Sequence, residues 1–211
     1  MAKSLLKGIG DTKKVEKFYD DWAENYDQSL IDWNYKAPRQ SATILNKYIK
    51  NKPKNLLDLA CGTGLFFQEY SKFFPLCICD GSDISEKIID ISRKKKIYRK
   101  LFKTSFEKKI KSDTRYDVVS LIGAMTYCED HLLLLKLVFS YLKRNGYFIF
   151  TQRTDLWEKL NFDKLLKNNP YFKITHISRP LNYLPKNKDF KSKVKIRIVL
   201  LNKSQLNIKS T

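Results

Sequence analysis

Asp58-Leu59-Ala60-Cys61-Gly62-Thr63-Gly64, which follows the apolar pair Leu56-Leu57, decides the fold of this chain. An apolar strand runs into an acidic residue, then a turn with two glycines, then a run that opens a helix, Leu65-Phe66-Phe67. A glycine there lets the backbone pass close to a ligand, because no Cβ blocks the approach. The unpaired N–H groups of the helix start can bind an anionic or polar group. The pattern Asp-x-x-x-Gly-x-Gly is one glycine short of the dinucleotide fingerprint.

A second acidic residue is expected about 20 residues further on, at the end of the next strand, where it would bind ribose. The short apolar run Leu76–Cys79 fits that strand, and Asp80-Gly81-Ser82-Asp83-Ile84-Ser85 follows it. Asp83 has the better spacing, and Asp80 is the alternative. Asp83 or Ser85 also suits the N-cap of the helix that the next isoleucines predict, and both roles are compatible.

Several segments resemble one family. Asp58–Gly64 resembles the S-adenosylmethionine (SAM) loop of class I methyltransferases, and Gly81–Ser85 resembles the element that carries the ribose-binding acid in that family. Tyr19–Asp27 resembles the Tyr-Asp-x-Trp-Ala-x-x-Tyr-Asp element that precedes the core of many small-molecule methyltransferases. With three further segments, the chain is similar to methyltransferase-like proteins of the Williams-Beuren chromosomal-region type over roughly residues 15–155. The further segments are Tyr35–Pro38, Ile122–Ala124 and Leu142–Gly146.

The resemblance implies which residues hold the cofactor. Asp58 would orient the loop or bond the amino group of SAM, and Asp83 would accept from both ribose hydroxyls. Tyr19 would act as a lid, although a tyrosine at helical spacing also suits plain packing. Gly123 would keep room for the methyl group. The remaining cofactor positions are Ala60, Gly62, Gly64, Ile84, Ser105 and Phe106.

The resemblance also implies a substrate side. Tyr26, Glu129 and His131 are the candidate catalytic residues, although His131 equally suits an ordinary surface histidine. An amine that arrives neutral needs no base, whereas an acid or hydroxyl acceptor places more demand on one. The expected substrate-binding residues are Trp33, Tyr35, Met125, Tyr127 and Arg153.

Two departures from the family pattern affect the expected specificity. The aspartate that binds adenine in many relatives has no equivalent, and Thr104-Ser105-Phe106 stands in its place. There Ser105 could bond adenine and Phe106 could pack on its ring. The loop after the fourth strand lacks the Asn/Asp-Pro-Pro-Tyr signature of enzymes that methylate DNA bases and glutamine. The missing signature therefore makes methylation of nucleic-acid bases the less favoured activity.

The alternation of strands and helices predicts a parallel sheet with right-handed crossovers. Together with the resemblance, it predicts an α/β fold: the Rossmann-like, seven-stranded class I methyltransferase sheet, with its last strand antiparallel. One domain is expected over 1–211, with a helical cap at 1–50 and a SAM-binding core at 51–211. The expected strands are Leu56–Leu59, Leu76–Cys79, Tyr98–Phe102, Tyr116–Ile122, Tyr147–Thr151, Phe172–Ile177 and Val194–Leu201. The expected helices begin at Lys13 and cover Pro38–Tyr48, Leu65–Phe73, Ile84–Ser92, His131–Leu142 and Trp157–Leu166, with a turn at Lys143–Gly146.

Composition and charge limit the partners. The net charge is +19 at pH 7, from 41 Lys and Arg against 22 Asp and Glu, but the excess is mostly lysine spread along the chain. RNA-binding surfaces favour arginine with interleaved aromatics, so nucleic acid is the less favoured partner. Peripheral contact with an anionic membrane stays open, and no obligate protein partner is expected. The chain lacks a signal core and a span of about 20 apolar residues, which favours a cytoplasmic protein.

The cysteines and the acceptor complete the expectations. The four cysteines are expected to be reduced and mostly buried, and Cys77-x-Cys79 without further partners is no metal site.

The favoured function is SAM-dependent methyl transfer to N or O of a small molecule, with S-adenosylhomocysteine (SAH) as product. The alternatives are a lipid head group or RNA as acceptor, and a non-catalytic SAM-binding protein. A nicotinamide-dependent dehydrogenase is less favoured, because the third glycine is missing.

Overall fold

The computed structural model describes residues 11–188, 190 and 194–203. The predicted tail at 1–12 lies mostly outside the described residues. The strands are β1 (Asn55–Leu59), β2 (Ile78–Asp83), β3 (Lys100–Lys103), β4 (Tyr116–Leu121), β5 (Leu142–Arg153), β6 (Phe172–Ile177), β7 (Leu181–Asn182) and β8 (Lys195–Lys203). The helices are α1 (Thr12–Trp22), η2 (Ala23–Asn25), α2 (Tyr26–Asp32), α3 (Ala37–Tyr48), α4 (Leu65–Ser71), α5 (Glu86–Lys95), η3 (Met125–Tyr127), α6 (His131–Tyr141), α7 (Thr154–Lys159) and α8 (Phe162–Asn168).

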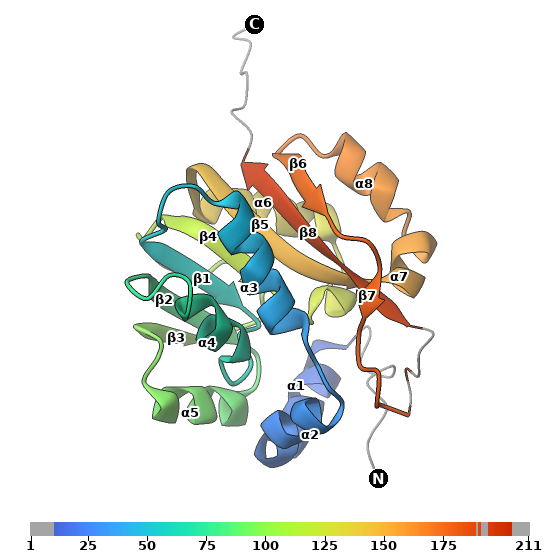
Figure 1. The fold of residues 1–211 in the computed structure, drawn as a ribbon. Helices are drawn as coiled ribbons and strands as arrows, with labels where there is room; N and C mark the ends of the chain where they lie inside the picture. Colours follow the sequence, from blue (N-terminus) through green and yellow to red (C-terminus); the bar gives the residue numbers. More distant parts are fainter. Residues whose placement is uncertain (1–10, 189, 191–193, 204–211) are drawn as a thin grey trace, which may run out of the picture.

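One twisted sheet runs through the molecule (Figure 1). Within the described residues it has eight strands, in the order β3-β2-β1-β4-β5-β8-β6, with the short β7 paired to β8. Strands β1 to β5 pair in parallel, whereas β8 lies antiparallel between β5 and β6. The predicted α/β fold of the class I methyltransferase type is therefore confirmed. β7 is the one strand beyond the seven that were expected.

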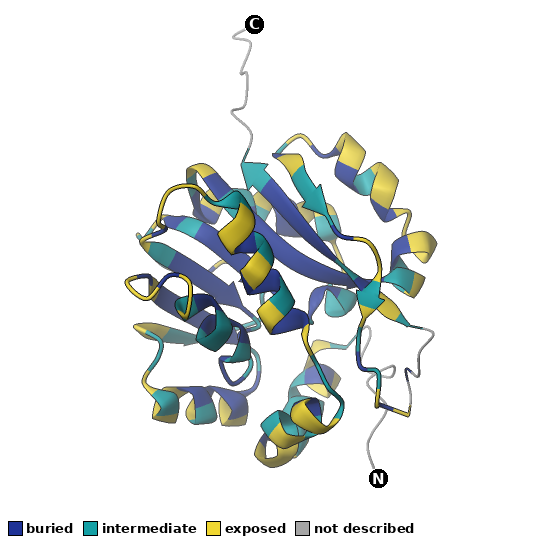
Figure 2. Cartoon of the chain, in the orientation of Figure 1, coloured by how far each residue is buried: buried dark blue, intermediate teal, exposed yellow. Residues whose placement is uncertain are grey.

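Helices cover both faces of the sheet, as the alternating side chains of the strands require. Leu56 of β1 points into a core shared with α3 and α4, whereas its neighbour Leu57 points into a core shared with α6. In β5, Ile149 likewise points into the core with α3 and α4, and Phe148 points into the core with α6. The central strands are accordingly buried, and the helices keep exposed residues on their outward sides (Figure 2).

The second strand differs from its prediction. β2 begins at Ile78 and continues to Asp83, and Leu76 of the predicted strand is 87% exposed. Polar residues can occupy this buried strand because they have partners. Arg99 donates to both carboxylate oxygens of Asp80, at 2.9 and 2.5 Å, and the Tyr116 hydroxyl donates at 2.8 Å. The ion pair keeps Asp80 inside the sheet.

Two further local predictions were wrong. Trp157–Leu166 is not one helix, because Asn161 has a left-handed φ of 47° and separates α7 from α8. Trp157 Nε1 donates to Asp163 Oδ2 across that break at 3.0 Å. The predicted turn Lys143–Gly146 lies within β5 as a bulge, where the pairing with β4 shifts register and Asn145 has a φ of 63°.

Asp58 is a buried carboxylate in the middle of the sheet. It accepts from Ser120 Oγ of the neighbouring β4 at 2.7 Å and from the Tyr98 hydroxyl at 2.8 Å. Burial raises the pKa of Asp58 to about 7, although these two hydrogen bonds act to lower it. The nearby charge of Asp83 raises this pKa further. Near neutral pH, Asp58 therefore exists in both protonation states.

We expect the substitution Asp58→Asn to change how stability depends on pH. The folded protein holds the Asp58 proton up to pH about 7, whereas the unfolded chain loses it near pH about 4. The free energy of unfolding of the natural protein therefore falls as pH rises between these values, and asparagine lacks this contribution. The stability of the variant relative to the natural protein should rise over this interval and level off above it. Urea unfolding at pH values from about 5 to about 8 measures it, and a constant difference would contradict the expectation.

Candidate functional site

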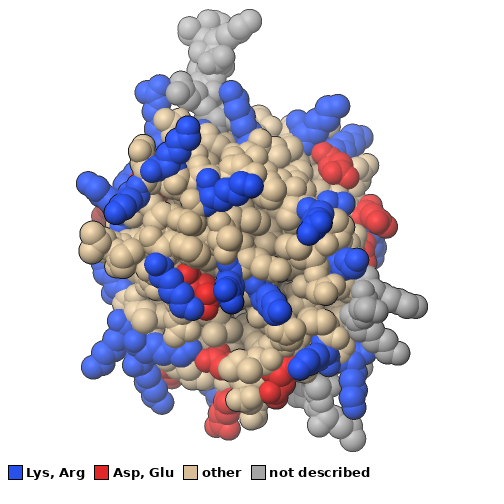
Figure 3. Space-filling model, viewed as in Figure 1, with Lys and Arg blue, Asp and Glu red and all other residues tan. Residues whose placement is uncertain are grey.

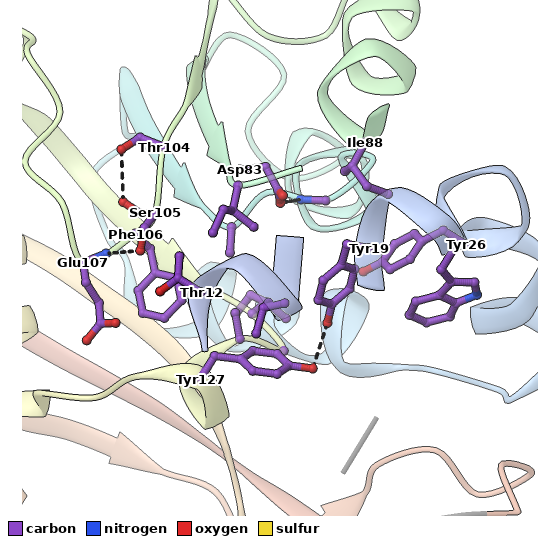
Figure 4. Close-up of a pocket in the computed structure, with 18 of the residues that line it drawn as sticks. Thr12, Tyr19, Tyr26, Asp83, Ile88, Thr104, Ser105, Phe106, Glu107 and Tyr127 are labelled. Atoms are coloured by element: carbon purple, nitrogen blue, oxygen red, sulfur yellow. Dashed lines mark hydrogen bonds between the residues drawn. The ribbon is translucent and has the colours of Figure 1, made fainter. Parts of the chain in front are cut away.

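A cavity lies over the carboxyl ends of the parallel strands, where ligands bind in open α/β sheets. It encloses about 970 Å³ of space, open solvent at its mouth included. Its floor comes from the loops after β1, β3 and β4 and from Asp83 at the end of β2. Helices α1 and α2 close the opposite side, so the N-terminal helices form a cap over the sheet (Figures 1 and 4).

Asp83, labelled in Figure 4, lines this cavity together with Gly62, and the two form one corner of it. The Gly62 N–H donates to Asp83 Oδ2 at 2.9 Å, and the Ser85 N–H donates to Oδ1 at 3.0 Å. Burial raises the pKa of Asp83, while these backbone hydrogen bonds act to lower it. Each carboxylate oxygen keeps a further lone pair for a ligand hydroxyl. The geometry therefore suits a carboxylate that binds a diol.

The two aspartates of β2 have different surroundings. Asp83 lines the cavity, whereas Asp80 is held inside the sheet by Arg99. Ser85 does cap the following helix, because its hydroxyl accepts from the Ile88 N–H at 3.2 Å. Of the two alternatives for the ribose carboxylate, the structure brings only Asp83 to the cavity.

Carboxylates of the cap contact the core at three points that sequence analysis missed. Asp20 accepts from Ser85 Oγ at 2.5 Å, and Glu16 pairs with Lys103 at 2.9 Å. Asp27 accepts from Thr63 Oγ1 in the glycine turn and pairs with Lys95 at 2.8 Å. Asp20 and Asp27 belong to the element that resembles Tyr-Asp-x-Trp-Ala-x-x-Tyr-Asp, so its aspartates carried a signal besides its tyrosines.

Aromatic side chains from four parts of the chain surround the inner end of the cavity. The Tyr19 and Tyr127 hydroxyls lie 3.1 Å apart, and the Tyr19 ring centre lies 6.1 Å from that of Tyr26 (Figure 4). The rings of Tyr35 and Tyr183 meet edge to face at 5.8 Å. Burial raises the pKa of all five phenols, so they stay neutral at neutral pH. Tyr183 was missed because no motif marks the loop after β7.

Two loops complete the wall. Gly123, after β4, has a φ of 85° and donates its N–H to Thr151 Oγ1 at 2.8 Å. A Cβ on Gly123 would lie 2.7 Å from the Tyr35 hydroxyl, so the cavity requires glycine there. Ser105 and Phe106, after β3, line another part of the cavity floor, and the Ser105 hydroxyl accepts from the Glu107 N–H at 3.3 Å. The loops after β3 and β4 therefore line the cavity without filling the space between Gly123 and the tyrosines.

Two thirds of the predicted site residues line this cavity, and the others lie elsewhere. The cavity wall contains Tyr19, Tyr26, Tyr35, Ala60, Gly62, Asp83, Ile84, Ser105, Phe106, Gly123, Tyr127 and Glu129. The predicted residues outside its wall are Trp33, Asp58, Gly64, Met125, His131 and Arg153.

Near the glycine turn, the exceptions support the cavity from outside. Asp58 lines a smaller adjoining pocket that shares Tyr26, Tyr35, Ala60 and Ile122 with the main cavity. A Cβ on Gly64 would meet Ile97 at 2.6 Å, because the helix start packs there on the segment before β3. Trp33 packs on Trp22, with ring centres 5.4 Å apart. These residues lie behind the wall.

The other exceptions are held by partners of their own. Met125 is only 2% exposed and belongs to the core. The ring of His131 meets Phe162 edge to face at 5.0 Å, and burial lowers its pKa. Arg153 is buried, pairs with Asp155 at 2.5 Å and lies 4.9 Å from the centre of the Phe190 ring. None of the three lines the cavity, and their predicted roles toward a substrate stay predictions.

Within the described part of the chain, no group of three His, Cys, Asp or Glu residues could hold a metal ion. The four cysteines are free, as expected, and three of them are buried. None of the helices that the structure describes has the length and apolarity needed to cross a bilayer.

The chain is similar to known proteins in sequence and in fold. It is 30% identical to human methyltransferase-like protein 27 over 125 residues, 56% of this chain and 50% of that protein. It is 22% identical to the malonyl-[acyl-carrier protein] O-methyltransferase of Bacillus anthracis over 138 residues, 65% of this chain and 51% of that protein. The chain thus spans about half the length of these curated relatives.

Solved structures share the fold. A SAM-dependent methyltransferase of Thermotoga maritima, a possible histamine N-methyltransferase, has a TM-score of 0.64 at 16% identity and covers 90% of this chain and 99% of its own. The plantazolicin methyltransferase BpumL in complex with SAH has a TM-score of 0.61 at 18% identity, and covers 92% of this chain and 100% of its own. The family described as "Methyltransferase domain" matches residues 28–186. This match spans most of the 211 residues, and the chain therefore belongs to the methyltransferase domain family.

Proposed function

We propose that the protein is an enzyme that transfers a methyl group from SAM to a nitrogen or oxygen atom of a small molecule. The observation that carries this proposal is the position of Asp83 in the cavity corner. Its carboxylate is held by the Gly62 and Ser85 N–H groups and keeps lone pairs for a ribose diol. Membership of the methyltransferase domain family and fold neighbours that bind SAH support the same cofactor.

The residues of the cavity fit SAM. Asp83 would hold the ribose, Ser105 and Phe106 would hold the adenine, and Gly62 would let the backbone approach the methionine part. A Cβ on Gly62 would lie 3.3 Å from the Tyr26 hydroxyl, in the space between the glycine turn and the cap. Asp58 would act behind this turn, where it bonds Tyr98 and Ser120. When bound, SAM supplies a methyl group on a sulfonium centre, which is already activated for transfer.

The protein's own contribution is to position the reactants and exclude water. The cap covers the cavity with Tyr19, Trp22 and Tyr26, and Tyr35 and Tyr127 border the same space. Holding two reactants in line can lower a barrier by about 7–11 kcal/mol. Neutral phenols can bond an acceptor without competing for the methyl group as phenolates would. His131 does not line the cavity, whereas Tyr26 and Glu129 do, and of these two the Glu129 carboxylate is the one that suits the base role.

A second candidate acceptor has support from another part of the surface. An open groove between α3 and β6 is lined by Lys36, Arg39, His176 and Arg179. Such a basic groove would attract the phosphate of a lipid head group or of RNA. Binding to anionic vesicles or RNA that weakens with salt would favour these acceptors over a freely diffusing small molecule.

We expect Asp83→Asn to weaken SAH binding by about ten- to a hundredfold, because hydrogen bonds to a charged group are worth about 1.5–3 kcal/mol. Calorimetric titration of SAH measures the loss, with NAD as a comparison ligand. Asp90→Asn on the exposed side of α5 is the matched control, and it should bind SAH as the natural protein does. Unchanged affinity in Asp83→Asn would refute the proposed site. Labelled SAM with metabolite extracts then tests turnover, and SAH binding without any turnover would favour the non-catalytic alternative.

We expect Gly123→Ala to destabilise the protein through two separable effects. The left-handed φ costs about 1–2 kcal/mol for a residue with a Cβ, and this Cβ also clashes with the Tyr35 hydroxyl. Tyr35→Phe removes the clashing atom, and the next Tyr35 atom lies 3.8 Å away, in ordinary contact. The double variant should therefore lose only the backbone contribution in urea unfolding. Strictly additive losses would show that the clash is not the cause.

A further inference from the structure

We propose that the methyl acceptor binds as an organic cation, such as a protonated amine on a small aromatic or apolar framework. This inference rests on the proposed function, because it assigns the substrate class of the same cavity. It excludes carboxylates and phosphates as the part of the acceptor that enters the cavity. The argument starts from the contrast between the cavity wall and the rest of the surface.

The cavity wall has the opposite charge to the protein. The chain carries a net charge of +19, and Lys and Arg are spread widely over the face that Figure 3 shows. The wall nevertheless contains four carboxylates, from Asp11, Asp83, Glu107 and Glu129. Among the described residues that form this wall there is no Lys, Arg or His. An anion would leave water for a wall without a counter-charge, which is costly.

Two of the four carboxylates, Glu107 and Glu129, are neither assigned to the cofactor nor paired with a cation of the described residues. Asp83 is assigned to the ribose, and Asp11 caps α1 and pairs with Lys14 at 3.5 Å. Glu107 Oε1 accepts from the Glu129 N–H at 2.9 Å, the Asp130 N–H at 3.2 Å and the Cys128 thiol at 3.4 Å, so it also holds the loop before α6. Neither Glu107 nor Glu129 forms an ion pair within the described residues. Both therefore remain available to attract a cation.

Two cations outside the wall, Arg153 and Lys95, are each paired with a carboxylate. Arg153 could have reversed the charge of the site, but its side chain is 5% exposed and pairs with Asp155 at 2.5 Å. Lys95 pairs with Asp27 of the cap at 2.8 Å. Neither the Arg153 guanidinium nor the Lys95 ammonium lines the cavity, so an anionic group would find only neutral donors in the described wall, such as phenol, serine and threonine hydroxyls.

Aromatic rings at the inner end of the cavity provide a second kind of attraction for a cation, in addition to the carboxylates. The ring centres of Trp22 and Tyr26 lie 4.7 Å apart and those of Tyr19 and Tyr127 lie 6.1 Å apart, both as edge-to-face pairs, and all four residues line the cavity. Aromatic rings that surround a ligand can bind an ammonium group through their faces. Among the described residues the Tyr26 hydroxyl has no hydrogen-bond partner, so it can accept from an N–H of the ligand.

The proton of such an acceptor must leave before the methyl group is transferred. The free nitrogen lone pair then forms the C–N bond while the C–S bond breaks, and the electron pair of that bond stays on sulfur. The released proton goes to bulk water, and Glu129 is an exposed residue of the cavity wall that can pass it on. No further reactant is needed.

The test measures binding to the SAH-loaded protein by calorimetry, without turnover. Phenethylamine, 2-phenylethanol and 3-phenylpropionate share a framework and differ in charge. The amine should bind at least about tenfold tighter than the alcohol, and the carboxylate should bind more weakly than either. No preference for the amine over the alcohol, including no binding of any probe, overturns the inference. If the natural protein does not bind SAH at all, the proposed function itself is refuted.

Matched variants assign the preference to the wall. Glu107→Gln and Glu129→Gln together should reduce amine affinity and leave the alcohol and SAH unchanged, whereas Glu158→Gln on the exposed side of α7 should change none of them. Tyr127→Phe keeps the ring and should keep the preference, while Tyr127→Leu should lose it. SAH affinity reports whether each variant is folded. Unchanged amine affinity in both the double variant and Tyr127→Leu, with SAH binding intact, overturns the assignment.

Discussion

The hydrogen bond from the Gly62 N–H to the Asp83 carboxylate is the interaction on which the site depends. It joins the turn after β1 to the end of β2, and both oxygens of Asp83 are thereby held by backbone donors. A buried carboxylate without such donors would be costly, so the two loops keep one relative position. The cap is tied to the same corner, because Ser85 bonds Asp20 and Thr63 bonds Asp27. One small hydrogen-bond network therefore positions both the loops at the strand ends and the helical cap that covers the cavity.

Much of this arrangement could be predicted from local sequence. The glycine turn and Asp83 follow apolar strands at a spacing that brings them to one edge of a parallel sheet. Side-chain partners distant in sequence could not be predicted in this way. Arg153 was expected after the fifth strand but is the last residue of β5, where it contacts Asp155 and Phe190 and does not line the cavity. Tyr183 enters the wall from a loop without any periodicity, and the break at Asn161 depends on one left-handed residue.

The charge of a whole chain and the charge of its binding site are separate properties. An excess of lysine over the outer surface keeps a protein soluble and attracts anions at long range. It says nothing of a cavity whose wall is made from the ends of strands and the inner side of a cap. Here the wall is acidic and aromatic, while the groove beside α3 is basic. An anionic partner and a cationic acceptor therefore need not compete for the same place.

The position of β8 affects how the chain can fold during synthesis. β8 ends at Lys203, yet it lies between β5 and β6, and its antiparallel pairs with both strands close the sheet. Before β8 has left the ribosome, β5 presents an unpaired apolar edge and β6 has no neighbour. Such an edge can pair with other chains. Among the described strands, the one made latest therefore protects strands made earlier, and a chaperone that covers β5 during synthesis would relieve this risk.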